Sequence, residues 1–314
     1  MVKAIVSGGA GFIGSHLVDA LIDRGDDVHI IDNLHSGRIE NIHPCATLHV
    51  MDISNPEVKD TIVHIKPDVV FHLADQAEAA ASAQTQNNDT ELTIDGTINI
   101  LDGCYLSQTK KFIFASSAAV YGENQKDLVS EEDPVAPISC YGLSKLAEES
   151  YIRLFSRIYQ LPYTILRYAN VFGPRKAAEE AGGVIAIFLN QLKKGEPLKI
   201  YGDGNQTCDF IYVKDIVKAN LAAINHGDGE IIHASTAQTT SINQLINHLR
   251  NVYGSEPKTI YLDAKAADIR HSCLDNGKAR KLLNFVPSYD IVDGLRETYE
   301  AEVLNKKREQ RQEL

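Results

Sequence analysis

The chain of 314 residues is 44% hydrophobic and 23% charged, which is the balance of an ordinary globular protein. Its net charge of −11 argues against nucleic acid as a partner, because a phosphate backbone requires clustered lysine and arginine. No apolar run is long enough to span a membrane, no secretion-signal pattern is visible, and the cysteines and histidines show no metal-ligand spacing. We therefore expect a cytoplasmic protein without a membrane, nucleic-acid or metal partner.

The N-terminal half alternates short apolar runs with amphipathic stretches. The first helical pattern runs from Phe12 to Ile22 and is ended by Gly25. Each apolar run is short enough for a buried parallel strand. The runs are Lys3–Ser7, Val28–Asp32, Thr47–Met51, Val69–Leu73, Phe112–Ser116 and Tyr163–Tyr168. This alternation predicts right-handed crossovers and a parallel sheet that is covered on both faces.

The pattern changes after about Val171, where short strands and helices mix with turn clusters. Ser241 is placed to cap an amphipathic helix that continues through Leu249. We predict an α/β fold with a doubly wound parallel-sheet Rossmann domain over residues 1–170, to which the chain returns near 209–235. Residues 171–208 and 236–314 would form a smaller, mixed α/β substrate lobe.

Glycines recur where the first strand meets the first helix. Gly8, Gly11 and Gly14 form a G-x-x-G-x-x-G motif, which lets the backbone approach a pyrophosphate at the helix N-terminus. Asp32 ends the second predicted strand, where its carboxylate could accept a hydrogen bond from a ribose 2′-hydroxyl and would repel a 2′-phosphate. The motif in this context predicts a bound dinucleotide, NAD rather than NADP.

Tyr141 and Lys145 are four residues apart, which places both on one face if the stretch is helical. Free tyrosine has a pKa of about 10, so a base that works at neutral pH needs a pKa about 3 units lower. A nearby ammonium and a cationic nicotinamide ring would both lower it. Taken alone, the Tyr141–Lys145 spacing is explained more readily by two residues on a solvent-exposed helix face than by a catalytic pair. Ser117 supports the catalytic interpretation, because it follows a strand at the edge where open α/β sheets bind ligands.

Over nearly its whole length the chain resembles the extended short-chain dehydrogenase/reductase family, and within it the UDP-glucose 4-epimerase-like branch. The segments that carry the resemblance are Gly8–His16, Phe71–Ala74, Gly96–Thr97, Ser116–Gly122, Tyr141–Glu148, Leu166–Arg175, Ile200–Gly204 and Asp209–Val213.

The resemblance implies an isomerase that epimerises a UDP-hexose at C4 with NAD as cofactor. Tyr141 would remove the proton of the sugar 4-hydroxyl while the C4 hydride passes to NAD. The 4-keto sugar would turn about its diphosphate linkage and take the hydride back on its other face. Ser117 would orient the 4-hydroxyl, and Lys145 would hold the nicotinamide ribose and lower the pKa of Tyr141. UDP-glucose and UDP-galactose are the expected pair, with UDP-GlcNAc and UDP-GalNAc as further candidates.

Two sets of binding residues are expected on the same basis. The cofactor residues are Gly8, Gly11, Phe12, Ile13, Gly14, Asp32, Asn33, Asp52, Ile53, Leu73, Ala74, Gln76, Tyr141, Lys145 and Tyr168. The substrate residues are Ser117, Tyr141, Asn170, Val184, Tyr201, Lys265 and Ser272. A turn aspartate is a competing explanation for Asp52, and a half-buried strand tyrosine is an equally good one for Tyr201.

Ala118 and Ala119 bear on the choice of reaction. Relatives that eliminate water carry an acid pair at these positions, and nucleotide-sugar decarboxylases carry a glutamate there. Two alanines supply no second acid or base, which favours oxidation and return at C4. The alternatives are a nucleotide-sugar oxidoreductase with net NAD(H) turnover and a non-catalytic NAD-binding protein.

Two cations expected from the resemblance are replaced. Cys208 stands where an arginine meets the substrate phosphates, and Lys265 replaces a second arginine, which keeps the charge but loses the bidentate geometry. Either the diphosphate is bound more weakly, or another cation such as Arg175 or Arg270 has taken over. Ser272 aligns with a gate beside the sugar, where a small residue leaves room for a 2-acetamido group.

Relatives pair two subunits through a four-helix bundle. The corresponding stretches here are Asp89–Leu106 and Ser144–Tyr159, so we expect a homodimer. Their apolar positions could equally be packed within one subunit.

Overall fold

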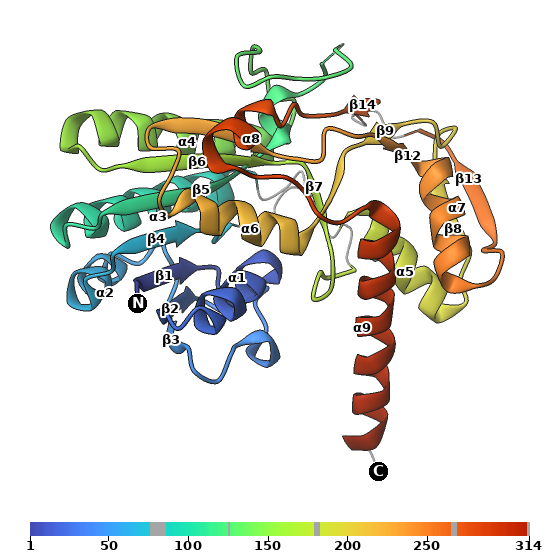
Figure 1. Ribbon diagram of the computed structural model, residues 1–314, viewed down its shortest axis with the longest axis horizontal. Coiled ribbons are helices and arrows are strands. Elements are labelled where there is room, and N and C mark those ends of the chain that lie inside the picture. Colours follow the sequence, from blue (N-terminus) through green and yellow to red (C-terminus); the bar gives the residue numbers. More distant parts are fainter. Residues whose placement is uncertain (76–85, 125, 179–182, 265–268, 313–314) are drawn as a thin grey trace.

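The computed structural model describes residues 1–75, 86–124, 126–178, 183–264 and 269–312 (Figure 1). Its centre is a seven-stranded parallel sheet in the order β11–β6–β5–β4–β1–β2–β3. The strands are β1 Lys3–Ser7, β2 Asp27–Asp32, β3 Thr47–Val50, β4 Val69–His72, β5 Lys111–Ser117, β6 Tyr163–Tyr168 and β11 Glu230–Ala234. The six strands predicted from the sequence are present within one residue at each end, and β11 completes the sheet.

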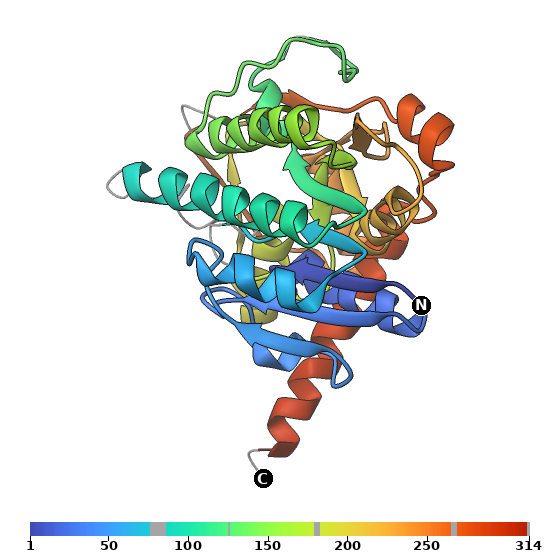
Figure 2. The ribbon, with the colours of Figure 1, turned by 90° about the vertical axis from the view of Figure 1, so that its left-hand side faces the viewer.

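Helices cover both faces of this sheet. On one face α2 Glu57–Ile65, α3 Gln86–Leu106 and α4 Cys140–Tyr159 lie side by side (Figure 2). On the other face lie α1 Phe12–Asp23 and α6 Val213–Ala223. Apolar side chains such as Ile62 and Ile100 fill the first layer, and Leu17 and Ile216 belong to the second. The predicted doubly wound α/β fold is confirmed.

The order of the strands reverses beside β1. The chain adds β2 and β3 on one side of β1, then crosses to β4 on the other side and continues outward to β5 and β6. At such a reversal the connections leave in opposite directions, and the carboxyl ends of the two central strands border a crevice that binds ligands. Gly8 directly follows β1 and Leu73 directly follows β4, so the predicted cofactor residues begin at this point.

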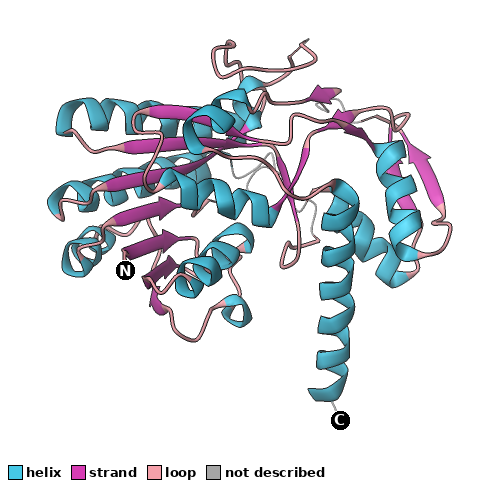
Figure 3. Cartoon of the chain, in the orientation of Figure 1, coloured by secondary structure: helices cyan, strands magenta, loops and turns pink. Residues whose placement is uncertain are grey.

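Beyond β6 the chain builds smaller sheets. β7 Asn170–Phe172 pairs with β10 Phe210–Tyr212, and β8 Leu198–Tyr201 pairs with β13 Thr259–Leu262. β9 Thr207–Cys208 lies between β12 Thr240–Ser241 and β14 His271–Ser272. The remaining helices are α5 Val184–Lys194, α7 Ile242–Tyr253, α8 Gly277–Leu283 and α9 Ile291–Gln312, with short 3₁₀ helices η1 Ile39–Asn41 and η3 Ala118–Tyr121 (Figure 3). Within the described ranges, no helix is long and apolar enough to cross a membrane.

Ser241 begins α7 as predicted. Its Oγ accepts a hydrogen bond from the backbone N–H of Gln244 at 3.1 Å, and the Gln244 side chain accepts one from the Ser241 N–H at 2.8 Å. This reciprocal cap satisfies two amides that the helix itself leaves unpaired.

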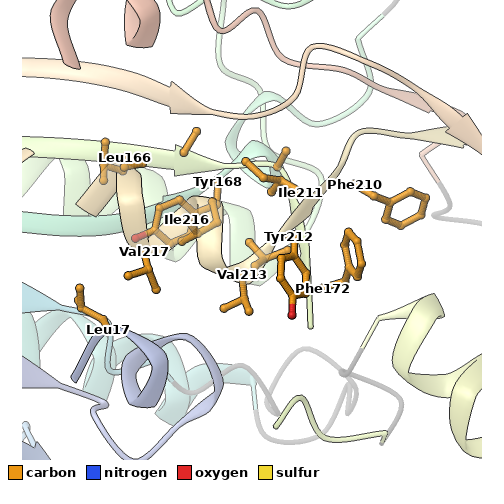
Figure 4. Close-up of a cluster of buried hydrophobic side chains, with 14 of the residues drawn as sticks. Leu17, Leu166, Tyr168, Phe172, Phe210, Ile211, Tyr212, Val213, Ile216 and Val217 are labelled. Atoms are coloured by element: carbon orange, nitrogen blue, oxygen red, sulfur yellow. The ribbon is translucent and has the colours of Figure 1, made fainter. Parts of the chain in front are cut away.

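One hydrophobic core joins the large sheet to the smaller elements. Figure 4 shows Tyr168 of β6, Ile216 of α6 and Tyr212 of β10 within one cluster of buried side chains. The same cluster extends to Leu245 of α7 and Leu295 of α9. The division into a domain of residues 1–170 with 209–235 and a separate substrate lobe stays a prediction, because the core runs across it.

Candidate active site

The glycine loop between β1 and α1 leaves no room for side chains. Gly8 has a φ of +71°, and a Cβ there would lie 2.7 Å from the backbone nitrogen of Ala74. A Cβ on Gly14 would overlap the carbonyl oxygen of Gly8. The loop therefore packs directly against the end of β4. It leads through Gly11 into α1, whose first turn has no side-chain cap, and a pyrophosphate can be bound at such a helix N-terminus.

Asp32 closes the other side of this loop. Its side chain accepts hydrogen bonds from the backbone N–H groups of Ala10 and Leu34, both at 2.9 Å. Each carboxylate oxygen has a second lone pair, which remains available to a ribose hydroxyl. Beyond Asp32, the Asn33 amide donates to Asp52 at 2.7 Å. Burial raises the pKa of Asp52, but hydrogen bonds from Ser54 and Asn33 outweigh it and hold that pKa below its usual value.

The end of β4 is tied to β1 through Ser7. The backbone N–H groups of Leu73 and Ala74 both donate to the Ser7 Oγ at 3.2 Å, and the His72 ring contacts the same oxygen at 2.7 Å. Burial lowers the pKa of His72 to about 3, so this imidazole is neutral. The buried Ser7 hydroxyl thereby links the carboxyl ends of β1 and β4, the two strands that flank the crevice.

These residues fit NAD. Asp32 is the last residue of β2, and the other predicted cofactor residues in this region follow the carboxyl ends of β1 to β4, namely Gly8, Gly11–Gly14, Asn33, Asp52, Ile53, Leu73 and Ala74. The glycine cradle accepts a pyrophosphate, and the carboxylate of Asp32 suits a ribose without a 2′-phosphate. Gln76 lies outside the described residues.

The carboxyl end of β5 is where three predicted catalytic residues lie together, namely Ser117, Tyr141 and Lys145. Ser117 is the last residue of β5, and its Oγ accepts a hydrogen bond from the Ala119 N–H at 3.1 Å as η3 begins. Tyr141 lies in the first turn of α4, and Ser117 lowers the pKa of its phenol. The Nζ of Lys145, one turn further, is 6.0 Å from the centre of the Tyr141 ring. Tyr168 ends β6 opposite Ser117 in the register of the two strands.

A buried ion pair behind the site anchors α4. Arg167 of β6 donates to both carboxylate oxygens of Glu149, at 2.9 and 2.6 Å. Ser116 of β5 donates to the same carboxylate at 2.6 Å, and Arg167 also donates to the Tyr121 hydroxyl at 2.6 Å. Because all its members are buried and paired, this network holds α4 against β5 and β6.

Lys145 is paired with two carboxylates that sequence reasoning did not single out as its partners. Its Nζ lies 3.2 Å from Asp75, which follows β4, and 3.2 Å from Glu148. Glu148 also accepts a hydrogen bond from Thr97 of α3 at 2.7 Å. Lys145 and Glu148 are three residues apart, a spacing that brings side chains together on a helix, so the sequence did indicate Glu148 as a partner. Nothing local indicated Asp75.

The electrostatic balance at Tyr141 differs from the sequence-based expectation. Burial and the Asp75 carboxylate raise the pKa of Tyr141 to about 12, while Lys145 and the hydrogen bond with Ser117 act in the opposite direction. Lys145 therefore lowers the pKa as expected but does not overcome burial. Burial also lowers the pKa of Lys145, but Asp75 and Glu148 outweigh it and keep the group an ammonium with a raised pKa.

A cavity of about 480 Å³ lies between β7, α5, β8 and β9. Three predicted substrate residues line it, namely Asn170, Val184 and Tyr201, and so does Cys208. Ser272 is not among the lining residues but pairs with Cys208 in the register of β14 and β9. Lys265 lies outside the described residues.

Neither arginine proposed as a substitute cation lines the cavity. Arg175 pairs with Asp19 of α1 at 2.8 Å, and the exposed Arg270 pairs with Asp203 at 3.2 Å.

Several known proteins are similar to this chain in sequence and fold. The model of the NAD-dependent epimerase/dehydratase family matches residues 4–235. The crystal structure of UDP-glucose 4-epimerase from Thermotoga maritima with UDP-glucose has a TM-score of 0.93 at 39% identity, covering 96% of this chain and 99% of that one. UDP-N-acetylglucosamine 4-epimerase from Methanobrevibacter ruminantium, in complex with UDP-N-acetylmuramic acid, has a TM-score of 0.92 at 37% identity, covering 97% and 99%. UDP-N-acetyl-α-D-glucosaminuronate decarboxylase from Bacillus cytotoxicus is 32% identical over 94% of this chain and 96% of its own.

The chain therefore belongs to the NAD-dependent epimerase/dehydratase family. It is an NAD-dependent epimerase and thus an isomerase, and the family, cofactor and enzyme class predicted from the sequence are confirmed.

Replacing Asp75 by Asn should lower the pKa of Tyr141. The Asp75 carboxylate opposes deprotonation of the phenol, so without it Lys145 and Ser117 act against burial with less resistance. For a reaction in which Tyr141 is the base, the acid limb of the kcat/KM profile should move to lower pH. The exposed Asp95 of α3 provides the matched control, Asp95→Asn. An unmoved acid limb in D75N would contradict this electrostatic account.

Proposed function

We propose that this protein interconverts UDP-hexoses at C4, with UDP-glucose and UDP-galactose as the first pair and UDP-GlcNAc and UDP-GalNAc as the second. The observation that carries the proposal is the convergence of Ser117, Tyr141 and Lys145 at the same sheet edge as the glycine loop. The similarity to 4-epimerases named for UDP-glucose and UDP-N-acetylglucosamine, at 39% and 37% identity, supports this substrate class.

The residues divide the proposed chemistry among them. Tyr141 takes the proton of the sugar 4-hydroxyl and later returns it. Ser117, at the end of β5, donates to the same sugar oxygen and orients it. Lys145 remains positively charged beside the phenol and favours its deprotonated form. Oxidised NAD, when bound, would supply a positively charged ring and the hydride acceptor for C4 of the sugar.

Epimerisation is favoured over elimination or decarboxylation because η3 offers no acid. It begins with Ala118 and Ala119, whose methyl groups cannot transfer protons. Asp75 acts on the phenol electrostatically, but its carboxylate is paired with Lys145 at 3.2 Å. Oxidation at C4 and return of the hydride require only the serine, the tyrosine and the lysine.

Conversion of UDP-glucose or UDP-GlcNAc into the galacto epimer, without net NADH, is the expected activity. Tyr141→Phe should lower kcat by about 10²–10⁴-fold, because the proton of the 4-hydroxyl loses its acceptor. Chromatography of the products and absorbance of NADH are the measurements, with Tyr261→Phe on exposed β13 as control. No conversion of either sugar by the wild-type protein would refute the proposal, and stoichiometric NADH would favour a net oxidoreductase.

Ser272 should decide whether N-acetylated sugars are accepted. Its neighbour across the β14–β9 pair, Cys208, lines the cavity. Ser272→Tyr would place a bulky ring beside the sugar and should lower kcat/KM for UDP-GlcNAc by about 10-fold or more relative to UDP-glucose. Ser272→Ala keeps the site small and serves as the control. Equal losses on both sugars would show that the residue does not act as a gate.

We also propose that two copies pair through α3 and α4. The two helices lie side by side and carry several exposed apolar side chains. These are Tyr105 and Leu106 on α3 and Leu143, Tyr151, Leu154, Ile158 and Tyr159 on α4. The spacing of Tyr151, Leu154 and Ile158 places them on one helix face, which a second copy would remove from water.

Leu154→Glu should convert the dimer into a monomer, because it buries a charge in the proposed interface. Light scattering coupled to size exclusion measures the mass directly. Ile39→Glu changes a side chain that is 66% exposed on η1 and should leave the mass unchanged. A monomeric wild-type protein would exclude the proposed dimer.

A further inference from the structure

Lys176 lies between the glycine loop and the substrate cavity. Its Nζ donates a hydrogen bond to the carbonyl oxygen of Val171 in β7 at 2.7 Å. The same nitrogen is 5.4 Å from the centre of the ring of Phe12, the first residue of α1. The side chain also lines the cavity, together with Asn170 and Tyr201. The ammonium is therefore within reach of ligands bound on either side.

The segment that carries Lys176 is held against α1. The carbonyl oxygen of Pro174 lies 3.0 Å from the His16 ring, and Arg175 pairs with Asp19 at 2.8 Å. Both partners belong to α1, the helix that begins at the glycine loop. These contacts keep the lysine at the junction of the two sites.

No carboxylate in the described part of the chain pairs with Lys176. Glu302 lines the same cavity, but it pairs with Lys193 at 3.3 Å. Burial lowers the pKa of Lys176 to about 8. A bound anion would reverse this effect, because it stabilises the ammonium.

The N-terminus of α5 faces the same ammonium. Gly183 is the N-cap of this helix, and a Cβ built on it would lie 3.2 Å from the Lys176 Nζ. The first turn of a helix carries partial positive charge on its unpaired amides. A lysine and a helix N-terminus therefore lie together at the wall of one cavity, an arrangement that an anion between them would stabilise.

We propose that Lys176 binds a diphosphate group and supplies the charge that Cys208 does not. Cys208 of β9 and Lys176, which follows β7, line the same cavity. The diphosphate belongs either to the nucleotide sugar in the cavity or to the dinucleotide at the glycine loop. The assignment to the nucleotide sugar rests on the proposed function, whereas the assignment to the dinucleotide does not.

Binding of UDP, uridine and NAD to the full-length protein distinguishes the two sources. Calorimetry on Lys176→Met should show UDP binding about 10- to 100-fold weaker, with uridine unchanged because it lacks the phosphates. Lys176→Arg should restore most of the affinity, because it keeps the charge. A loss confined to NAD would assign the lysine to the cofactor pyrophosphate. Unchanged affinities for both UDP and NAD would overturn the proposal.

Two controls separate this effect from loss of charge or folding. Lys281→Met removes an exposed lysine on α8 and should leave both affinities unchanged. Thermal unfolding checks each variant, and Lys176→Gln replaces the Met variant if the latter does not fold. Both ligands bind without turnover, so a wild-type protein that converts no UDP-sugar would refute the proposed function while leaving the role of Lys176 to be decided by the affinities.

Discussion

A buried lysine ammonium sets the geometry on which the candidate site depends. The Lys145 side chain is only 3% exposed, and removing such a charge from water costs several kcal/mol unless carboxylates surround it. Asp75 and Glu148 meet this requirement, and the pair with Asp75 ties α4 to the end of β4. The same carboxylates oppose deprotonation of Tyr141. In the proposed reaction, a positively charged cofactor bound beside Tyr141 would oppose their effect and favour the deprotonated phenol.

Two consecutive glutamates allow α4 to serve both the site and the sheet. Residues that are adjacent in a helix point about 100° apart. Glu148 therefore reaches Lys145 and Thr97, while Glu149 is turned toward Arg167 and Ser116. The helix is held from behind by a fully paired network. Its first turn can then present Tyr141 to Ser117 without strain on the site itself.

The distribution of cations follows from the acidic character of the chain. The net charge is −11, and Arg175 and Arg270 each have a carboxylate partner. Lys176 differs because its described surroundings offer a carbonyl oxygen and a helix N-terminus instead. An acidic protein would need individually placed cations to bind the proposed diphosphate ligands, since its overall field repels anions.

The sequence by itself determined six of the seven strands of the large sheet, the glycine loop with Asp32, the Ser241 cap and the spacing of Tyr141 and Lys145. These are local patterns, because strand length, helix periodicity and capping depend on neighbours along the chain. Only the tertiary structure decided which carboxylates pair with Lys145, how burial raises the pKa of Tyr141, and that Lys176 rather than Arg175 lines the cavity. Each of these depends on distances between residues far apart in sequence, and electrostatic energies at buried groups follow those distances rather than any motif.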